Sequence, residues 1–187
     1  DAESGEPTGI INDYISLASD CMGEKSIEFQ MTGFDSQEEE LQALKDNRID
    51  MIFHMNQNPY EAEQNDIILS NTVFEVNVAV LTGVEKFDEN GKNTVAVSRN
   101  NLLGKWYISF NYPFWKIKEY DSSAEVEKAV HSGEADCFVV KAGQSLKTLA
   151  NSKMHSVFLT KPGDSCFAVT RENITLMNIL NKTIQTL

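Results

Sequence analysis

The chain has 187 residues, of which 41% are hydrophobic and 24% charged, as is ordinary for a globular protein that buries a core. Its 28 acidic residues exceed its 16 lysines and arginines, and the resulting net charge of −12 argues against nucleic acid or an anionic membrane as a partner. No apolar run approaches the ~20 residues of a membrane span.

The first half of the sequence predicts helices that alternate with short strands. Apolar residues recur at helical spacing in the predicted helices and alternate with polar ones in the predicted strands. The expected order is helix 9–22, strand 26–31, a helix from Ser36, strand 50–54, a polar loop over 55–60 and one long strand over 73–81. The long strand is expected to leave the first half of the fold.

The second half predicts the same alternation. Its expected order is strand 94–97, a loop into a short helix within 100–109, strand 115–120, a helix from Ser122, strand 137–140, helix 144–149, strands 156–159 and 166–169, and a closing helix 173–187. No linker or low-complexity segment divides the chain, so we expect crossing strands between its halves.

One pattern occurs in both halves. Ser36 and Ser122 each precede a glutamate by three residues, as in a helix capping box. Each copy continues through an amphipathic stretch and a turn to an aspartate, Asp50 or Asp136, and then a short buried strand. The repeat predicts two similar α/β lobes with a cleft between them, where a ligand could bind. The alternative is that any α/β protein contains capped helices followed by strands.

Seven segments resemble, in the same order over nearly the whole chain, motifs of the type 2 periplasmic solute-binding proteins (bacterial extracellular solute-binding protein family 3). They are residues 5–13, 43–52, 54–59, 68–70, 93–98, 129–136 and 167–171. Residues 113–118, 120–122 and 179–182 are more similar to the extracytoplasmic sensor modules of bacterial histidine kinases and diguanylate cyclases.

The resemblance implies a two-lobed α/β fold in which each lobe is a small sheet flanked by helices. We expect residues 1–75 and 167–187 to form lobe 1 and residues 80–165 to form lobe 2, joined by two crossing strands. The family begins with a strand that has no counterpart in this sequence, so the first strand of lobe 1 is expected to be missing.

The resemblance also implies a function. It predicts an extracytoplasmic sensing domain that binds a small molecule between its lobes and relays closure to a kinase or cyclase, within a full-length protein attached to the membrane. A free solute-binding protein of a transporter and a same-fold enzyme, such as a dehydratase or lytic transglycosylase, are the alternatives. We find no catalytic or metal-binding motif and expect no enzyme activity, no cofactor and no nucleic-acid partner for this chain. A homodimer is left open.

The sequence departs from the family where amino-acid ligands are held. Glu61 stands at about the position of the arginine that binds the ligand carboxylate, and Lys141 replaces the aspartate that binds its amine. The glycine–threonine loop of the second lobe is replaced by residues 99–101. Either the module has lost ligand binding and serves as a rigid spacer, or it binds a ligand with a cation toward Glu61 and an anion toward Arg99 and Lys141.

The candidate ligand-binding residues are those expected at the edge of each lobe that faces the cleft. They are His54, Asn56, Asn58, Glu61, Arg99, Asn100, Asn101 and Lys141. Each also has a structural interpretation: a histidine at a strand end, turn asparagines, or surface charges. The aromatic residues Trp106, Tyr107 and Trp115 are expected in the core, and Cys21 and Cys137 are expected to be buried.

Overall fold

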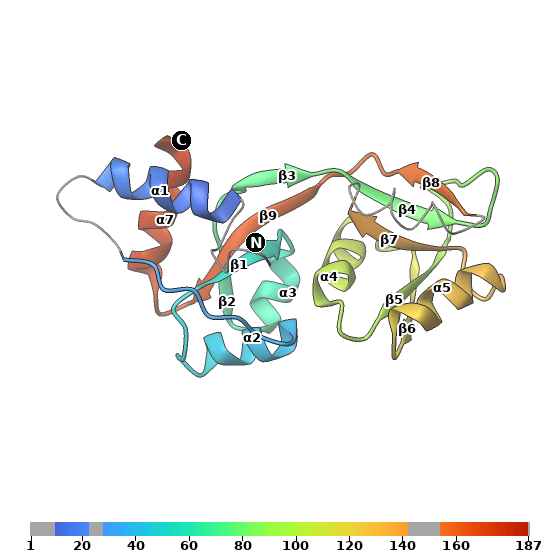
Figure 1. Ribbon diagram of the computed structural model, residues 1–187, viewed down its shortest axis with the longest axis horizontal. Helices are drawn as coiled ribbons and strands as arrows, with labels where there is room; N and C mark the ends of the chain where they lie inside the picture. The colour runs from blue at the N-terminus through green and yellow to red at the C-terminus, as the bar shows by residue number, and fades with distance from the viewer. Residues whose placement is uncertain (1–9, 23–27, 142–153, 187) are drawn as a thin grey trace, which may run out of the picture.

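A computed structural model describes residues 10–22, 28–141 and 154–186, which form two separate β-sheets flanked by helices (Figure 1). We call each sheet with the helices that pack on it a lobe. This is the α/β architecture with two lobes that the sequence predicts. The expected helix 144–149 lies outside the described residues.

The first lobe is built around β9. Its four-stranded sheet contains β1 (Ile52–Asn56), β2 (Ile67–Leu69), β3 (Phe74–Val76) and β9 (Gly163–Thr170). β9 pairs antiparallel with each of the other three strands. Helices α1 (Ile10–Met22) and α7 (Ile174–Thr186) cover it through a shared cluster around Tyr14, Phe167 and Leu180 (Figure 1). No described helix is both long and apolar enough to cross a membrane.

The second lobe has a five-stranded sheet in the order β6-β5-β7-β4-β8. Its strands are β4 (Val78–Thr82), β5 (Thr94–Ser98), β6 (Lys116–Tyr120), β7 (Cys137–Lys141) and β8 (His155–Phe158). β5 pairs parallel with β6 and β7, while β4 pairs antiparallel with β7 and β8. Cys137 is fully buried, as expected, whereas the side chain of Cys21 lies outside the described ones.

Two connections join the lobes. β3 pairs with β9 in the first sheet, whereas β4 pairs with β7 and β8 in the second (Figure 1). The expectation of a single strand over 73–81 is therefore wrong, because the chain changes its hydrogen-bonding partners at Asn77. β9 carries the chain back from the second lobe to the first. The lobe boundaries at residues 75, 80, 165 and 167 stay a prediction.

The duplicated pattern folds as predicted. Helices α2 (Gln37–Lys45) and α5 (Ser123–His131) begin at Ser36 and Ser122, whose hydroxyls accept the backbone N–H of Glu39 at 3.1 Å and of Glu125 at 3.3 Å. After each helix the chain turns through a residue with positive φ, Asn47 at 55° and Gly133 at 74°. Each unit then enters a strand, β1 in the first lobe and β7 in the second.

Two local predictions are wrong. Residues 28–31 do not form a strand, because they pair with no strand of either described sheet and so complete no hydrogen-bonded ladder. Residues 55–60 are not all loop, since α3 (Pro59–Gln64) begins there. Its signal was present in the sequence: Asn58 accepts the N–H of Glu61, and a proline in the first turn lacks only an N–H that would have no helical partner.

Helix α4 (Leu102–Asn111) lies between the two lobes (Figure 1). Tyr107 and Ile108 belong to the core cluster of the second lobe. Trp106, which is 2% exposed, instead packs among Leu44, Met55 and other apolar residues of the first lobe. One short helix therefore holds both lobes together and closes one side of the cleft. The three aromatic residues expected in the core, Trp106, Tyr107 and Trp115, are all buried.

Candidate functional site

The cleft between the lobes contains a cavity of about 250 Å³. Its walls come from α2, β1, β3 and β9 on one side and from β4, α4 and β7 on the other. Four of the predicted residues line it: His54, Asn56, Asn101 and Lys141. Apolar side chains, among them Val76, Leu103 and Val140, supply much of the remaining wall.

His54 and Lys141 meet across this cleft. His54 lies on β1 of the first lobe and Lys141 at the end of β7 in the second, 87 residues apart in sequence. The Lys141 Nζ lies 2.8 Å from His54 Nε2, and the other ring nitrogen, Nδ1, lies 2.8 Å from the hydroxyl of the buried Ser165. An ammonium can only donate, so His54 Nε2 accepts from Lys141, and its protonated Nδ1 donates to Ser165.

The electrostatics agree with this tautomer. Burial, together with the charge of Lys141, lowers the pKa of His54 from 6.5 to about 4, so the imidazole is neutral at pH 7. Lys141 remains exposed along part of its side chain, and burial of the rest lowers the pKa of its ammonium. The pair therefore joins one cationic group to one neutral acceptor.

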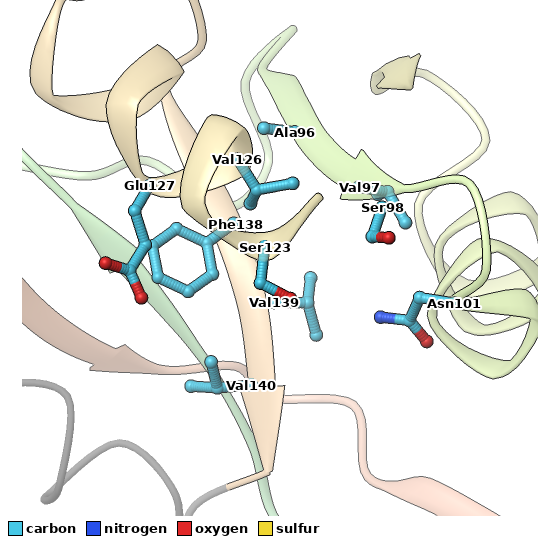
Figure 2. A pocket seen from close by; sticks show the side chains of 10 residues that line it. All are labelled: Ala96, Val97, Ser98, Asn101, Ser123, Val126, Glu127, Phe138, Val139 and Val140. Carbon is cyan, nitrogen blue, oxygen red and sulfur yellow. The ribbon is translucent and has the colours of Figure 1, made fainter. Parts of the chain in front are cut away.

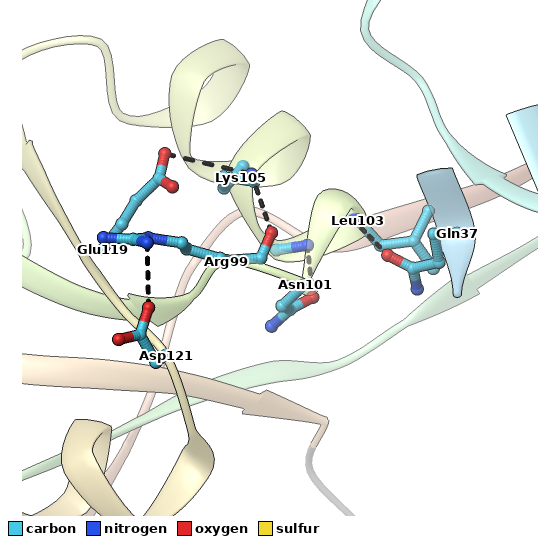
Figure 3. Close-up of polar contacts among 8 residues, drawn as sticks. Gln37, Arg99, Asn101, Leu103, Lys105, Glu119 and Asp121 are labelled. Atoms are coloured by element: carbon cyan, nitrogen blue, oxygen red, sulfur yellow. Dashed lines mark hydrogen bonds and ion pairs between the residues drawn. The ribbon is translucent and has the colours of Figure 1, made fainter. Parts of the chain in front are cut away.

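The amino end of α4 forms part of the cleft wall on the side of β4 and β7. Asn101 caps the helix, with its Oδ1 accepting the N–H of Gly104 at 2.8 Å. Gln37, from the first turn of α2 in the other lobe, accepts the N–H of Leu103 through its Oε1 at 3.0 Å (Figure 3). Both side-chain carbonyls are thus committed to the helix, which leaves both NH₂ groups free to donate elsewhere.

Two asparagines from the first lobe hold α4 from the side. Asn56 donates to the backbone carbonyl of Leu103. Asn58, only 2% exposed, donates at 3.0 Å to both the carbonyl of Trp106 and the hydroxyl of Ser109. Asn58 does not line the cavity, and its position is accounted for by these contacts and by its capping of α3.

The remaining predicted residues lie away from the cavity. Glu61 is in the first turn of α3 and does not line it. Arg99 points away from Asn101 and forms an ion pair at 2.9 Å with Asp121, with both side chains more than half exposed (Figure 3). Asn100 is exposed and also lies outside the lining. The structure thus brings together His54, which lies in the middle of β1 and not at a strand end as expected, and Lys141 at the end of β7, but not the charges at Glu61 and Arg99.

Sequence reasoning missed Gln37 as a lining residue. In the sequence it is only the residue after the Ser36 cap, in a turn rich in glutamate. Its place at the cleft depends on how α2 meets α4, 66 residues away, and no local pattern encodes that contact.

A second cavity, of about 380 Å³, adjoins the cleft between α5 and strands β5 and β7 (Figure 2). Its walls combine six apolar side chains with the polar residues Ser98, Asn101, Ser123 and Glu127, and all belong to the second lobe or to the start of α4. We place the candidate site in the smaller cavity, because only that one is lined by both lobes and contains the His54–Lys141 pair. Among the described residues no cluster of histidine, cysteine and acidic side chains could hold a metal ion.

Comparison with solved structures supports this two-lobed architecture. The BvgS periplasmic VFT2 domain of Bordetella pertussis aligns with 95% of this chain and 76% of its own, at 21% identity and a TM-score of 0.63. The substrate-binding protein of an amino acid ABC transporter aligns over 97% and 82%, at 20% identity and a TM-score of 0.64. An ancestral amino acid-binding protein, AncCDT-1, a precursor of cyclohexadienyl dehydratase, aligns over 97% and 80%, at 19% identity and a TM-score of 0.61.

These similarities establish the fold: the chain has the two-lobed architecture of the type 2 periplasmic solute-binding proteins, as its sequence motifs predict. No protein-family model matches the sequence, and no curated protein matches it either.

Proposed function

We propose that this chain is a binding module that holds a small molecule in the cleft between its lobes. The observation that carries the proposal is the cavity of about 250 Å³, lined by both lobes and crossed by the Lys141–His54 contact. A ligand there would touch both lobes at once and stabilise their closed arrangement. The cavity lies just below the ~300–1,000 Å³ of drug-sized sites, so it suits a metabolite and excludes a peptide or a long oligosaccharide.

The module is proposed to act as the extracytoplasmic sensor of a bacterial membrane signalling protein. The sensor-like segments 113–118, 120–122 and 179–182 favour this role, and the chain is as similar to the BvgS VFT2 domain as to the substrate-binding protein of a transporter. The intact gene tests it: a downstream membrane span followed by a kinase or cyclase domain is expected, whereas a lone signal peptide would indicate a transport protein.

An enzymatic role is less well supported by the site. General acid–base catalysis commonly needs a carboxylate or a titrating histidine near the substrate. The described lining of the cleft contains no carboxylate, and the His54 imidazole is neutral and engaged at both nitrogens. Turnover of small prephenate-like acids, the reaction class suggested by the dehydratase precursor, would contradict the proposal.

A thermal-shift screen of metabolites tests the binding function directly. A ligand at about 100 times its dissociation constant adds ~2.7 kcal/mol to the free energy of unfolding. The substitution Val76→Trp is expected to abolish the shift, because Val76 lines the cleft opposite Gly163 and an indole would fill the space. Val84→Trp is the matched control, since Val84 is 45% exposed and lies outside the cleft.

The shift should persist in the Val84→Trp variant. If no compound produces a shift that Val76→Trp removes, the module is a spacer and the proposed binding function is wrong.

A further inference from the structure

The groups that line the cleft indicate the chemistry of its ligand. Lys141 carries the single charge of the described lining at pH 7, because His54 is neutral and no carboxylate is present. A ligand ammonium placed in the cleft would therefore meet a cation and no compensating anion. Burying an unpaired charge is costly, so the lining selects against amines and zwitterions.

Hydrogen-bond donors dominate the polar part of this lining. Lys141 gives one of its three N–H groups to His54 and keeps two for a ligand. The side-chain amides of Gln37 and Asn101 have their oxygens bonded to α4, so they present NH₂ groups. Such a set suits a ligand rich in acceptors, of which a carboxylate is the strongest partner for an ammonium.

The side-chain oxygen of Asn56 adds an acceptor to the lining. Asn56 uses its NH₂ on the carbonyl of Leu103, which leaves its Oδ1 able to accept. This oxygen could accept a ligand hydroxyl but would pair poorly with a second carboxylate.

The rest of the lining is apolar and the space is small. Val76, Val78, Leu103, Val139 and Val140 present aliphatic side chains to the same cavity. They match a short branched hydrocarbon tail, because burying such a tail against aliphatic side chains favours binding.

We infer that the cleft binds a compact monocarboxylate with a 2-oxo or 2-hydroxy group and a short branched aliphatic tail, its carboxylate facing Lys141. This inference rests on the proposed binding function. It also reverses the polarity expected for an amino-acid binder at the position of Lys141, where the sequence motif predicts a group that holds an amine. His54 accepts a hydrogen bond from Lys141 and, held by the buried Ser165, fixes where the ammonium lies.

Isothermal titration calorimetry with three matched probes tests the inference. 2-Oxoisovalerate carries the full set of groups, L-valine has an ammonium in place of the oxo group, and 3-methyl-2-butanone lacks the carboxylate. We expect 2-oxoisovalerate to bind at least tenfold more tightly than either of the others. Lys141→Met, which keeps an unbranched stem of similar length and removes the charge, should weaken binding about 10- to 100-fold.

The control substitution is Lys92→Met on the exposed turn before β5, which should leave the affinity unchanged. Equal or tighter binding of L-valine, or a Lys141→Met variant with unchanged affinity, overturns the inference. If an amine or a sugar produces the shift that Val76→Trp removes while no oxo or hydroxy acid does, the ligand class is wrong but the binding function stands. If nothing produces such a shift, both fail.

Discussion

We predict that the hydrogen bonds from Asn58 to α4 contribute strongly to the stability of the folded protein. Asn58 is 2% exposed, and its NH₂ donates to Trp106 and Ser109 while its oxygen caps α3. Asn58→Asp keeps the capping oxygen and nearly the same shape, but places an acceptor where the carbonyl of Trp106 requires a donor. The variant isolates the bond across the lobes, because aspartate caps a helix as well as asparagine does.

The magnitude follows from the cost of keeping the new aspartate protonated. Its folded-state pKa should be raised by burial, so the unfolded chain ionises first and the penalty grows as pH rises above ~3.9. Each pH unit above ~3.9 adds about 1.4 kcal/mol to the cost of protonation. This cost is therefore at most about 4 kcal/mol at pH 7 and about 1.5 kcal/mol at pH 5. One lost hydrogen bond adds about 1 kcal/mol at either pH.

Urea unfolding at pH 7 and pH 5, with the variant compared to the unchanged protein at each pH, measures the effect. The destabilisation should be about 5 kcal/mol at pH 7 and about half that at pH 5. Ser122→Asp is the matched control, because Ser122 is an exposed cap where the same carboxylate should change stability by less than about 0.5 kcal/mol. A penalty below about 1 kcal/mol at pH 7, or one that does not shrink at pH 5, would refute the reasoning.

Two further predictions concern the cleft and a turn. The pKa of His54 is about 4 in the folded protein and about 6.5 unfolded, so stability should fall as pH decreases through this window, by at most about 3 kcal/mol before solvent screening reduces it. His54→Asn should flatten that part of the pH profile in urea titrations, and an unchanged profile contradicts the assignment. Gly133→Ala should cost about 1–2 kcal/mol, because φ is 74° there although nothing crowds a Cβ. Gly83→Ala, without a positive φ, should be nearly neutral in the same thermal melt, and equal losses at both positions would remove the backbone explanation.

Much of the local structure could be predicted from the sequence because its causes are local. The capping serines Ser36 and Ser122 bond amides three residues away, and the turns at Asn47 and Gly133 depend on a single backbone conformation each. Apolar periodicity identified the closing helix α7, and ordered motifs identified the two-lobed fold. These signals survive in any tertiary context, since they involve neighbours along the chain.

The tertiary structure alone decided which residues form the site. Lys141 and His54 stand 87 residues apart, and their contact exists only because β7 and β1 lie on the two sides of one cleft. Arg99, which sequence order places near the same edge, turns instead to Asp121, because an exposed carboxylate lies within reach on its own lobe. Likewise the apolar character of Trp106 predicts burial but not that it packs into the other lobe. Burial depends on composition, whereas the choice of partner depends on how distant elements meet.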